Sequence, residues 1–126
     1  MNNPLYDSLF GVHSENDDPF LYLLDGKIIT YRQFLAASGR IANSLVERGL
    51  KPGDRVAIQV EKSPEVLNIY AACARAGLVF LPLNPSYTVD ELKYFIEIFV
   101  ASVKLSSNSI RFSVIWHHEI TKICPE

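Results

Sequence analysis

The sequence predicts an α/β fold, in which strands and helices alternate along the chain. Between residues 55 and 96, two strand patterns alternate with two helix patterns, which is typical of a parallel βαβ unit followed by a further helix. Upstream, the pair Asp25-Gly26 lies between two apolar runs and predicts a β-hairpin. The chain has 126 residues, with 48% hydrophobic and 21% charged, which fits one globular domain.

The first elements follow from short local signals. The apolar spacing in residues 5–10 predicts a short amphipathic helix, which Gly11 should end. The apolar runs 20–24 and 27–30 then form the hairpin. We expect a type I′ turn at Asp25-Gly26, because that turn requires positive φ at both central residues.

A long helix should follow the hairpin. Thr30 and Gln33 have the spacing of a capping box, and Gly49 suits the position just after the helix end. The pattern predicts that one apolar stripe of this helix faces the core, made of Phe34, Ala37, Ile41, Leu45 and Val46.

The central unit begins with a strand at residues 55–60. Ser63 as N-cap and Pro64 in the first turn predict a helix that Gly77 ends. Its expected apolar face consists of Val66, Leu67, Tyr70, Ala71 and Ala74.

The unit continues with a second strand and a second helix. The apolar run 78–83 predicts a strand buried on both faces, with Val79 and Leu81 parallel and adjacent to Val56 and Ile58. Pro82 should lie near its end. Thr88 and Glu91 then form another capping box, which opens a helix that carries Leu92, Phe95 and Ile96.

After Ile96, the residue patterns no longer predict a consistent order of helices and strands. Residues 97–103 are compatible with either more helix or a strand, and residues 111–116 have strand propensity. No glycine follows Gly77, although another α/β repeat would need some at its helix ends. We therefore expect two parts: a structured segment 1–96, and a divergent tail 97–126 that leaves apolar surface uncovered.

Composition excludes several classes of protein. Twelve basic and fourteen acidic residues give a net charge of −2, which argues against a nucleic-acid partner. No apolar run is long enough to span a bilayer. The two cysteines do not suggest a disulfide framework, and the first residues do not have the pattern of a signal or transit peptide, so we expect a cytoplasmic protein.

Few residues suggest chemistry. The basic turns 25–27 and 51–54 contain glycine but not the multiple-glycine spacing of a phosphate cradle, so we interpret them as surface turns. The cluster 117–119 with Cys124 has the wrong spacing and too few ligands for a metal site. Cys73 is expected to be a small buried residue, and His13 has no evident partner.

Neither the aromatic nor the arginine residues indicate a catalytic site. The aromatics are expected at the core or its rim, with a role in an acyl pocket left open, and the arginines on solvated faces. The residues concerned are Tyr70, Tyr87, Tyr94, Phe95, Arg40, Arg48, Arg55 and Arg75. We assign no residue as catalytic, cofactor-binding or metal-ligating.

Two motifs carry a family resemblance. Residues 49–56 read Gly-x-x-x-Gly-Asp-Arg-Val, and residues 76–84 read Ala-Gly-x-x-x-x-Pro-Leu-Asn. With them, the segment 26–96 resembles the N-terminal segment of the AMP-forming acyl-CoA synthetases, which are adenylate-forming ligases. Val-Glu-Lys-Ser at 60–63 and Leu-Pro-Leu-Asn-Pro-Ser-Tyr-Thr at 81–88 are most similar to malonyl-CoA synthetases.

The resemblance implies part of the large N-terminal domain of a ligase. For a full-length enzyme it implies ATP, Mg and CoA, and a carboxylate such as malonate or a fatty acid as substrate. The family's Ser/Thr/Gly-rich phosphate loop, its Tyr-Gly-x-Thr-Glu segment, its hinge aspartate and its C-terminal lysine are missing from this sequence. We therefore expect a fragment that is inactive alone; the alternatives are a small non-catalytic regulatory module or a functionless truncated product.

Overall fold

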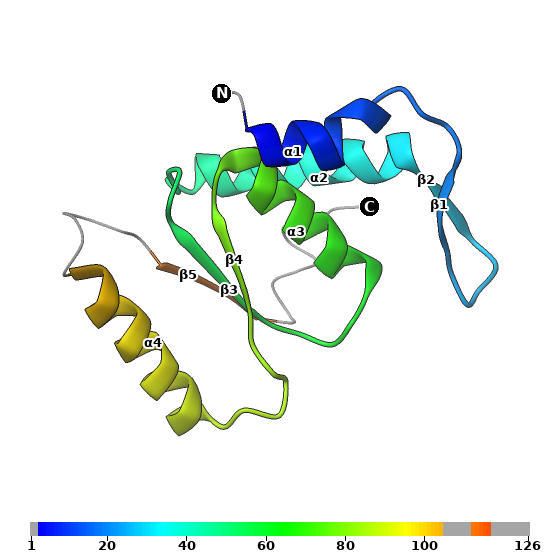
Figure 1. Ribbon diagram of the computed structural model, residues 1–126. Helices are drawn as coiled ribbons and strands as arrows, with labels where there is room; N and C mark the ends of the chain where they lie inside the picture. The colour runs from blue at the N-terminus through cyan, green and yellow to red at the C-terminus, as the bar shows by residue number, and fades with distance from the viewer. Residues whose placement is uncertain (1–2, 105–111, 117–126) are drawn as a thin grey trace.

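The computed structural model describes residues 3–104 and 112–116, which form a small α/β unit with a separate hairpin (Figure 1). The predicted fold class is confirmed. The elements in chain order are α1 (Pro4–Leu9), the 3-10 helix η1 (Gly11–His13), β1 (Pro19–Tyr22), β2 (Ile28–Thr30), α2 (Tyr31–Glu47), β3 (Arg55–Gln59), α3 (Pro64–Ala76), β4 (Val79–Pro82), α4 (Val89–Lys104) and β5 (Phe112–Trp116).

The main sheet has three parallel strands in the order β4-β3-β5. Val56 in β3 pairs with Phe80 in β4, with α3 as the connection between the two strands. The predicted parallel βαβ unit is therefore confirmed. Figure 1 shows α3 on one side of these strands and α4 on the other. Among the described residues, no helix is long and apolar enough to cross a membrane.

The hairpin closes differently from the expected type I′ turn. The Leu23 N–H donates to the Lys27 carbonyl oxygen (2.9 Å), and the Gly26 N–H donates to the Leu23 carbonyl oxygen (3.0 Å). The central residues of the turn are therefore Leu24 and Asp25, followed by Gly26 at φ +85°. This is a three-residue loop, which needs positive φ only at its glycine. The Asp25 carboxylate favours it by accepting the Lys27 N–H at 2.9 Å.

Two of the three predicted helix starts are capped as expected. The Thr30 hydroxyl accepts the Gln33 N–H, and the Gln33 side chain accepts the Thr30 N–H at 3.0 Å. Thr88 and Glu91 form the same reciprocal pair, with 2.8 Å between the Thr88 nitrogen and a Glu91 carboxylate oxygen. Ser63 occupies the N-cap position of α3, but its side chain makes no cap hydrogen bond.

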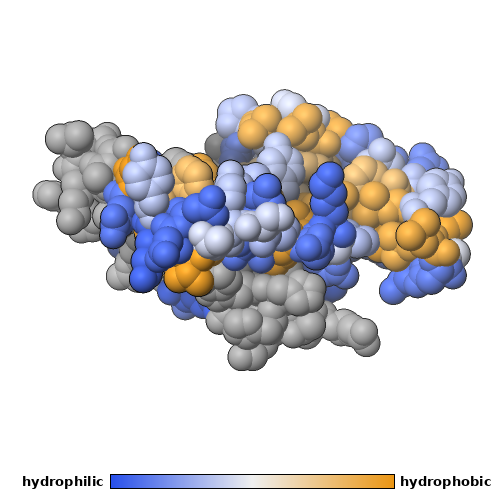
Figure 2. Space-filling view, turned by 90° about the horizontal axis from the view of Figure 1, so that it is seen from below, coloured by the Kyte–Doolittle hydropathy of each residue, from blue (hydrophilic) through white to orange (hydrophobic). Residues whose placement is uncertain are grey.

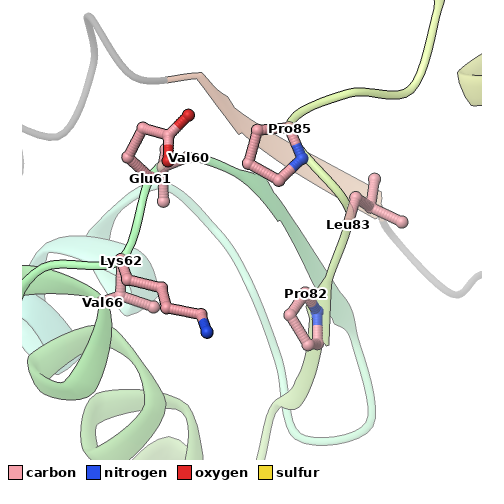
Figure 3. Close-up of a pocket in the computed structure, with 7 residues that line it drawn as sticks. All are labelled: Val60, Glu61, Lys62, Val66, Pro82, Leu83 and Pro85. Atoms are coloured by element: carbon pink, nitrogen blue, oxygen red, sulfur yellow. The ribbon is translucent and has the colours of Figure 1, made fainter.

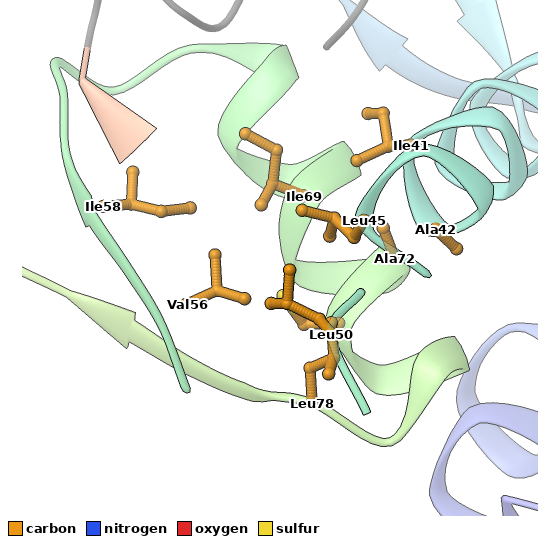
Figure 4. Packing of buried hydrophobic residues seen from close by; sticks show 10 residues of the cluster. Ile41, Ala42, Leu45, Leu50, Val56, Ile58, Ile69, Ala72 and Leu78 are labelled. Carbon is orange, nitrogen blue, oxygen red and sulfur yellow. The ribbon is translucent and has the colours of Figure 1, made fainter. Parts of the chain in front are cut away.

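The core lies between α2, α3 and one face of β3, as Figure 4 shows. The expected stripes are only partly right: Val46, Leu67 and Tyr70 are 54%, 44% and 38% exposed. Because α3 packs against both α2 and the sheet, its buried arc is centred on Ile69 and Cys73 instead. The main cluster consists of Ile41, Ala42, Leu45, Leu50, Val56, Ile58, Ile69, Ala72, Cys73 and Leu78.

β4 is not buried on both faces, contrary to expectation. Its side chains Phe80 and Leu81 are half-buried, and Val79 is 43% exposed. The reason is topological, since β4 is an edge strand and β3 occupies the centre of the sheet. The exposed side of β4 therefore contributes apolar surface.

The chain after Ile96 contributes regular structure. α4 continues without a break to Lys104, which decides between the two alternatives for residues 97–103 in favour of helix. β5 pairs with β3 in a continuous parallel register, with Val56 opposite Ser113 and Gln59 opposite Trp116. Residues 112–116 of the tail therefore form the third strand of this sheet, in agreement with their strand propensity. Residues 105–111 and 117–126 lie outside the described part of the chain.

The N-terminal segment is fastened to α2 and α3. The Asn3 side chain caps α1 and donates a hydrogen bond to the Ala74 carbonyl oxygen of α3. Arg32 of α2 binds the Asp17 carboxylate (2.7 Å) and the Glu15 carboxylate (3.1 Å) in the loop before β1. Gly11 ends α1 as expected, although the chain then continues as η1.

Candidate functional site

The carboxyl ends of β3 and β4 lie side by side and lead into a fixed loop. Gln59, the last residue of β3, donates through Nε2 to the carbonyl oxygens of Asn84 (3.1 Å), Pro85 (3.4 Å) and Tyr87 (3.0 Å). The loop after β4 is therefore held against the end of β3. In parallel α/β sheets, this edge is where ligands bind.

A pocket of about 350 Å³ lies at this edge (Figure 3). A neighbouring hollow of about 380 Å³ shares Lys62 and Val66 with it and extends along the start of α3, where Ser63 and Leu67 line it. The residues that line the pocket are mostly apolar, and they are Val60, Glu61, Lys62, Val66, Pro82, Leu83 and Pro85.

The charges at the pocket are two and of opposite sign. In Figure 3 the Lys62 side chain extends across the pocket toward Pro82, whereas the Glu61 carboxylate lies away from the Lys62 ammonium. The first turn of α3 adds partial positive charge, which is offset by Glu65 in the same turn, and the Ser63 side chain does not cap it. The arrangement can hold one negative charge beside an apolar wall.

The two basic turns are not phosphate cradles. In the turn 51–54, the Gly53 N–H donates to the Gly77 carbonyl oxygen (2.8 Å), and the Asp54 N–H donates to the Lys51 carbonyl oxygen (2.9 Å). The Lys51 N–H donates to the Asp54 carboxylate at 2.8 Å. These donors are already used within the fold, so the turn does not fit a nucleotide phosphate. In the turn 25–27, the N–H groups of Gly26 and Lys27 are used in closing the hairpin.

The other residues considered as functional candidates have structural roles where the structure describes them. Burial raises the pKa of the Cys73 thiol to about 12, so this residue is an unreactive core side chain, as expected. His13 does have partners, contrary to expectation: its ring stacks on Tyr31 (4.5 Å between centroids) and its Nδ1 lies 3.4 Å from Asn16 Nδ2. The cluster 117–119 and Cys124 lie outside the described residues. Within the described ranges, no group of three or more His, Cys, Asp or Glu residues could hold a metal ion.

The aromatic residues lie at the rim of the core rather than in the pocket. Tyr70 packs edge-on against Phe80 at 5.4 Å between centroids, and Tyr87 packs against Phe95 at 5.0 Å. Tyr94 is largely exposed, at 61%. None of these side chains lines the pocket at the carboxyl edge among the residues described there.

The arginine residues have mainly surface roles. Arg75 lies over the Tyr6 ring at 5.5 Å, and Arg55 donates to the Gly53 carbonyl oxygen at 3.2 Å. Arg40 and Arg48 are exposed on α2 and at its C-cap. Arg40, Arg48 and Arg75 are therefore exposed as expected, whereas Arg55 is half-buried, and Arg75 also links α3 to α1 through Tyr6.

An apolar patch lies away from the pocket, on the β1–β2 hairpin. Tyr22 and Ile28, which pair across the hairpin, are 73% and 48% exposed, and Leu24 at its tip is fully exposed. Figure 2 shows hydrophobic residues at the right-hand end of the molecule, where this hairpin projects.

Comparison with known proteins places these features in a family. The model of the family described as "AMP-binding enzyme" matches residues 12–119, and thus extends beyond Ile96. Bacitracin synthase 3 from Bacillus licheniformis is 34% identical over 89 residues, which cover 70% of this chain and 1% of that protein. Fatty acid–[acyl-carrier-protein] ligase ScoC from Streptomyces coeruleorubidus is 37% identical over 75 residues, which cover 60% of this chain and 14% of that protein.

Solved structures agree with this assignment. ATP-bound MatB from Rhodopseudomonas palustris is 34% identical and superposes with a TM-score of 0.77, over 98% of this chain and 28% of that chain. This chain therefore spans little more than a quarter of MatB. The family match, the sequence motifs and the shared fold show that the chain belongs to the AMP-binding enzyme family of adenylate-forming ligases and corresponds to an N-terminal segment of them.

Proposed function

We propose that this chain supplies the N-terminal α/β layer of an ATP-dependent acyl-CoA synthetase. The reaction is the conversion of a carboxylate, ATP and CoA into acyl-CoA, AMP and pyrophosphate, with malonate or a fatty acid as substrate. The observation that carries the proposal is the similarity to MatB, which extends over 98% of this chain. The similarity to a fatty acid ligase, at 37% identity, supports the wider choice of substrate.

We further propose that the 126-residue chain does not form acyl adenylates by itself. Adenylate formation needs donors and a metal around a phosphate that carries developing charge. The glycine-containing turn 51–54 uses its backbone donors internally. The role proposed for this chain is therefore to build and support a layer of the ligase, with the reacting phosphate held by residues of other segments.

An exchange assay tests the second proposal. The purified chain is incubated with ATP, Mg²⁺, radiolabelled pyrophosphate and either malonate or a fatty acid, with heat-treated protein as the control. We expect no exchange above that control. Carboxylate-dependent exchange that is lost on heating would show that the chain is an enzyme in its own right.

A chimera tests the first proposal. The segment of Rhodopseudomonas palustris MatB that aligns with this chain is replaced by residues 1–126, and carboxylate-dependent pyrophosphate exchange is measured. We expect a folded, active chimera. The matched control carries Ile69→Asp, which places a charge in the core and should abolish folding. A chimera that folds but does not exchange pyrophosphate would contradict the proposed role.

A further inference from the structure

We propose that Asp25 is a site of spontaneous covalent modification, at which aspartate converts to isoaspartate through a cyclic imide formed with Gly26. Asp25 is the only aspartate of the sequence that is followed by glycine. The product carries a free α-carboxylate, which isoaspartyl methyltransferases recognise and methylate with S-adenosylmethionine. The proposal does not depend on the ligase function, because it concerns only the loop of the β1–β2 hairpin.

The loop gives the reacting residues open access to water. Asp25 and Gly26 are exposed, as are their neighbours Leu24 and Lys27, and Figure 1 shows the hairpin projecting away from the main sheet. A Cβ built on Gly26 would meet no atom within 4 Å beyond the two adjacent residues. The rest of the fold therefore does not obstruct the reaction.

The Asp25 carboxyl group is directed toward the backbone that follows it. Its Oδ1 accepts the Lys27 N–H at 2.9 Å, so the side chain extends along the peptide group to which the Gly26 nitrogen belongs. The Gly26 N–H donates to the Leu23 carbonyl oxygen at 3.0 Å, and this hydrogen bond must open before the nitrogen can react. The bond belongs to a separate two-stranded sheet, so it can open while the main sheet stays folded.

The reaction needs only water as co-reactant. The Gly26 nitrogen attacks the side-chain carbonyl carbon of Asp25. A C–N bond forms, the C–OH bond breaks, and the hydroxyl leaves with the amide proton as water. Water then adds to one of the two carbonyl carbons of the resulting succinimide and breaks the C–N bond there, which gives either aspartate or isoaspartate. Glycine favours ring closure, because it has no side chain beside the nitrogen and its backbone is permissive.

Isoaspartate alters the hairpin, because the backbone then passes through the former side-chain carbon and is longer by one methylene group. The loop is closed by the Leu23 N–H, which donates to the Lys27 carbonyl oxygen at 2.9 Å, and loop length determines the turn that a hairpin adopts. We expect the Leu23 amide to lose protection against hydrogen exchange after conversion. The amides of Val56 and Ile58 in β3 should keep theirs.

Incubation of the folded chain in warm neutral buffer provides the test. Samples taken over time are treated with an isoaspartyl methyltransferase and radiolabelled S-adenosylmethionine. Electron-based fragmentation of the peptide that contains residue 25 then distinguishes isoaspartate from aspartate. We expect methyl acceptance to rise with time and the isoaspartate to be located at residue 25. No isoaspartate at residue 25, or equal amounts at the other aspartates, would overturn the proposal.

Two matched variants assign the reaction to this residue. Asp25→Glu keeps the charge, but its longer side chain would have to close a larger ring, so the accumulation of isoaspartate should be lost. Asp90→Glu makes the same change at an exposed aspartate in the first turn of α4 and should leave the accumulation unchanged. Retained methyl acceptance in Asp25→Glu would contradict the assignment, and melting curves check that both variants fold.

A parallel incubation in urea separates the reaction of the folded loop from that of unfolded molecules. We expect isoaspartate at residue 25 to accumulate in both samples. Accumulation confined to the urea sample would show that the folded hairpin protects Asp25, which would overturn the proposal.

Discussion

The hydroxyl of Ser38 in α2 lies 3.2 Å from the side-chain oxygen of Asn68 in α3, and this contact between residues 30 positions apart in the sequence joins the two helices. Ser38 is fully buried, and its hydroxyl also lies 2.9 Å from the Phe34 carbonyl oxygen. Because the hydroxyl has one proton, it donates to one of these oxygens at a time.

We expect Ser38→Ala to lower the free energy of unfolding by about 0.5 to 1.5 kcal/mol, the usual net value of one hydrogen bond. Asn43→Ala, on the exposed side of the same helix, should change it by less than about 0.5 kcal/mol. Urea denaturation measures both variants. Equal losses would mean that the Ser38–Asn68 contact does not stabilise the packing of α2 on α3.

Two aliphatic positions in α3 test which face of that helix is buried. Ile69 is fully buried and Leu67 is 44% exposed. Ile69→Ala should cost about 2 to 5 kcal/mol, because it removes core contacts and leaves a cavity. Leu67→Ala should cost well under half as much. If chemical denaturation showed a larger loss for Leu67→Ala than for Ile69→Ala, the face predicted from the sequence pattern would be the buried one.

The Cys73 thiol predicts a dependence of stability on pH. Its pKa is raised to about 12 by burial, so the thiol stays neutral in the folded chain where an unfolded thiol ionises. Its contribution to stability is therefore complete below pH 9 and is lost as the pH rises toward 12. In a Cys124→Ser background, the unfolding free energy should fall more steeply over this range than when Cys73→Ala is added.

Thiol labelling is the direct measurement for the same residue. In the Cys124→Ser background at pH 8, Cys73 should react with a disulfide reagent only slowly, and rapidly once urea is added. Rapid labelling of the folded chain would show that Cys73 is accessible.

The capping box of α4 predicts an unusual titration of Glu91. The Thr88 backbone N–H, and then its hydroxyl, donate to the Glu91 carboxylate and lower its pKa below the ordinary glutamate value. The cap is therefore complete above the ordinary value and is lost as the pH falls through the lowered one. Carbon-13 NMR should show Glu91 titrating below the ordinary glutamate value. Thr88→Val removes the hydroxyl hydrogen bond and should raise the pKa of Glu91, and no change would contradict the role of that hydroxyl.

The open edge at β4 predicts self-association of the isolated chain. Val79 is 43% exposed on the edge strand, and Tyr94 and Val89 on α4 are 61% and 67% exposed. We expect concentration-dependent sedimentation and binding of a hydrophobic dye. Val79→Lys should reduce both, because charged residues protect strand edges. Val46→Lys, at a similarly exposed site on α2, should have little effect, and a strictly monomeric chain would contradict the prediction.

The parts of the fold that could be predicted are those with local chemical signals. The capping pairs Thr30–Gln33 and Thr88–Glu91 are encoded three residues apart, and both occur in the structure. The buried face of α3 was predicted only in part, with Ala71 and Ala74 right and Leu67 and Tyr70 wrong, because this helix is apolar around most of its circumference. Whether Leu67 or Ile69 is buried depends on how α2 packs against α3, and no local sequence pattern predicts this packing.

The pocket has no signature in the sequence for a similar reason. Its walls come from the ends of two strands that only the parallel pairing brings together, Val60 and Pro82 among them. Valine and proline carry no chemistry that would mark them as a site. The available signal was indirect, since Lys62 follows a buried strand and precedes a helix start, where parallel sheets place their ligands.

The strand order β4-β3-β5 has a consequence for how the chain assembles during synthesis. Arg55 pairs with Val79 and also with Phe112, so the second pairing closes a loop more than twice as long as the first. By loop-closure entropy alone, the longer closure costs about 0.8 kcal/mol more. On the ribosome, β3, α3 and β4 emerge first, so β3 and β4 can pair before β5 is made. Until then, the other edge of the central strand β3 has no partner strand. A nascent chain arrested after α4 should therefore protect the amides between β3 and β4 while the other edge of β3 still exchanges with solvent.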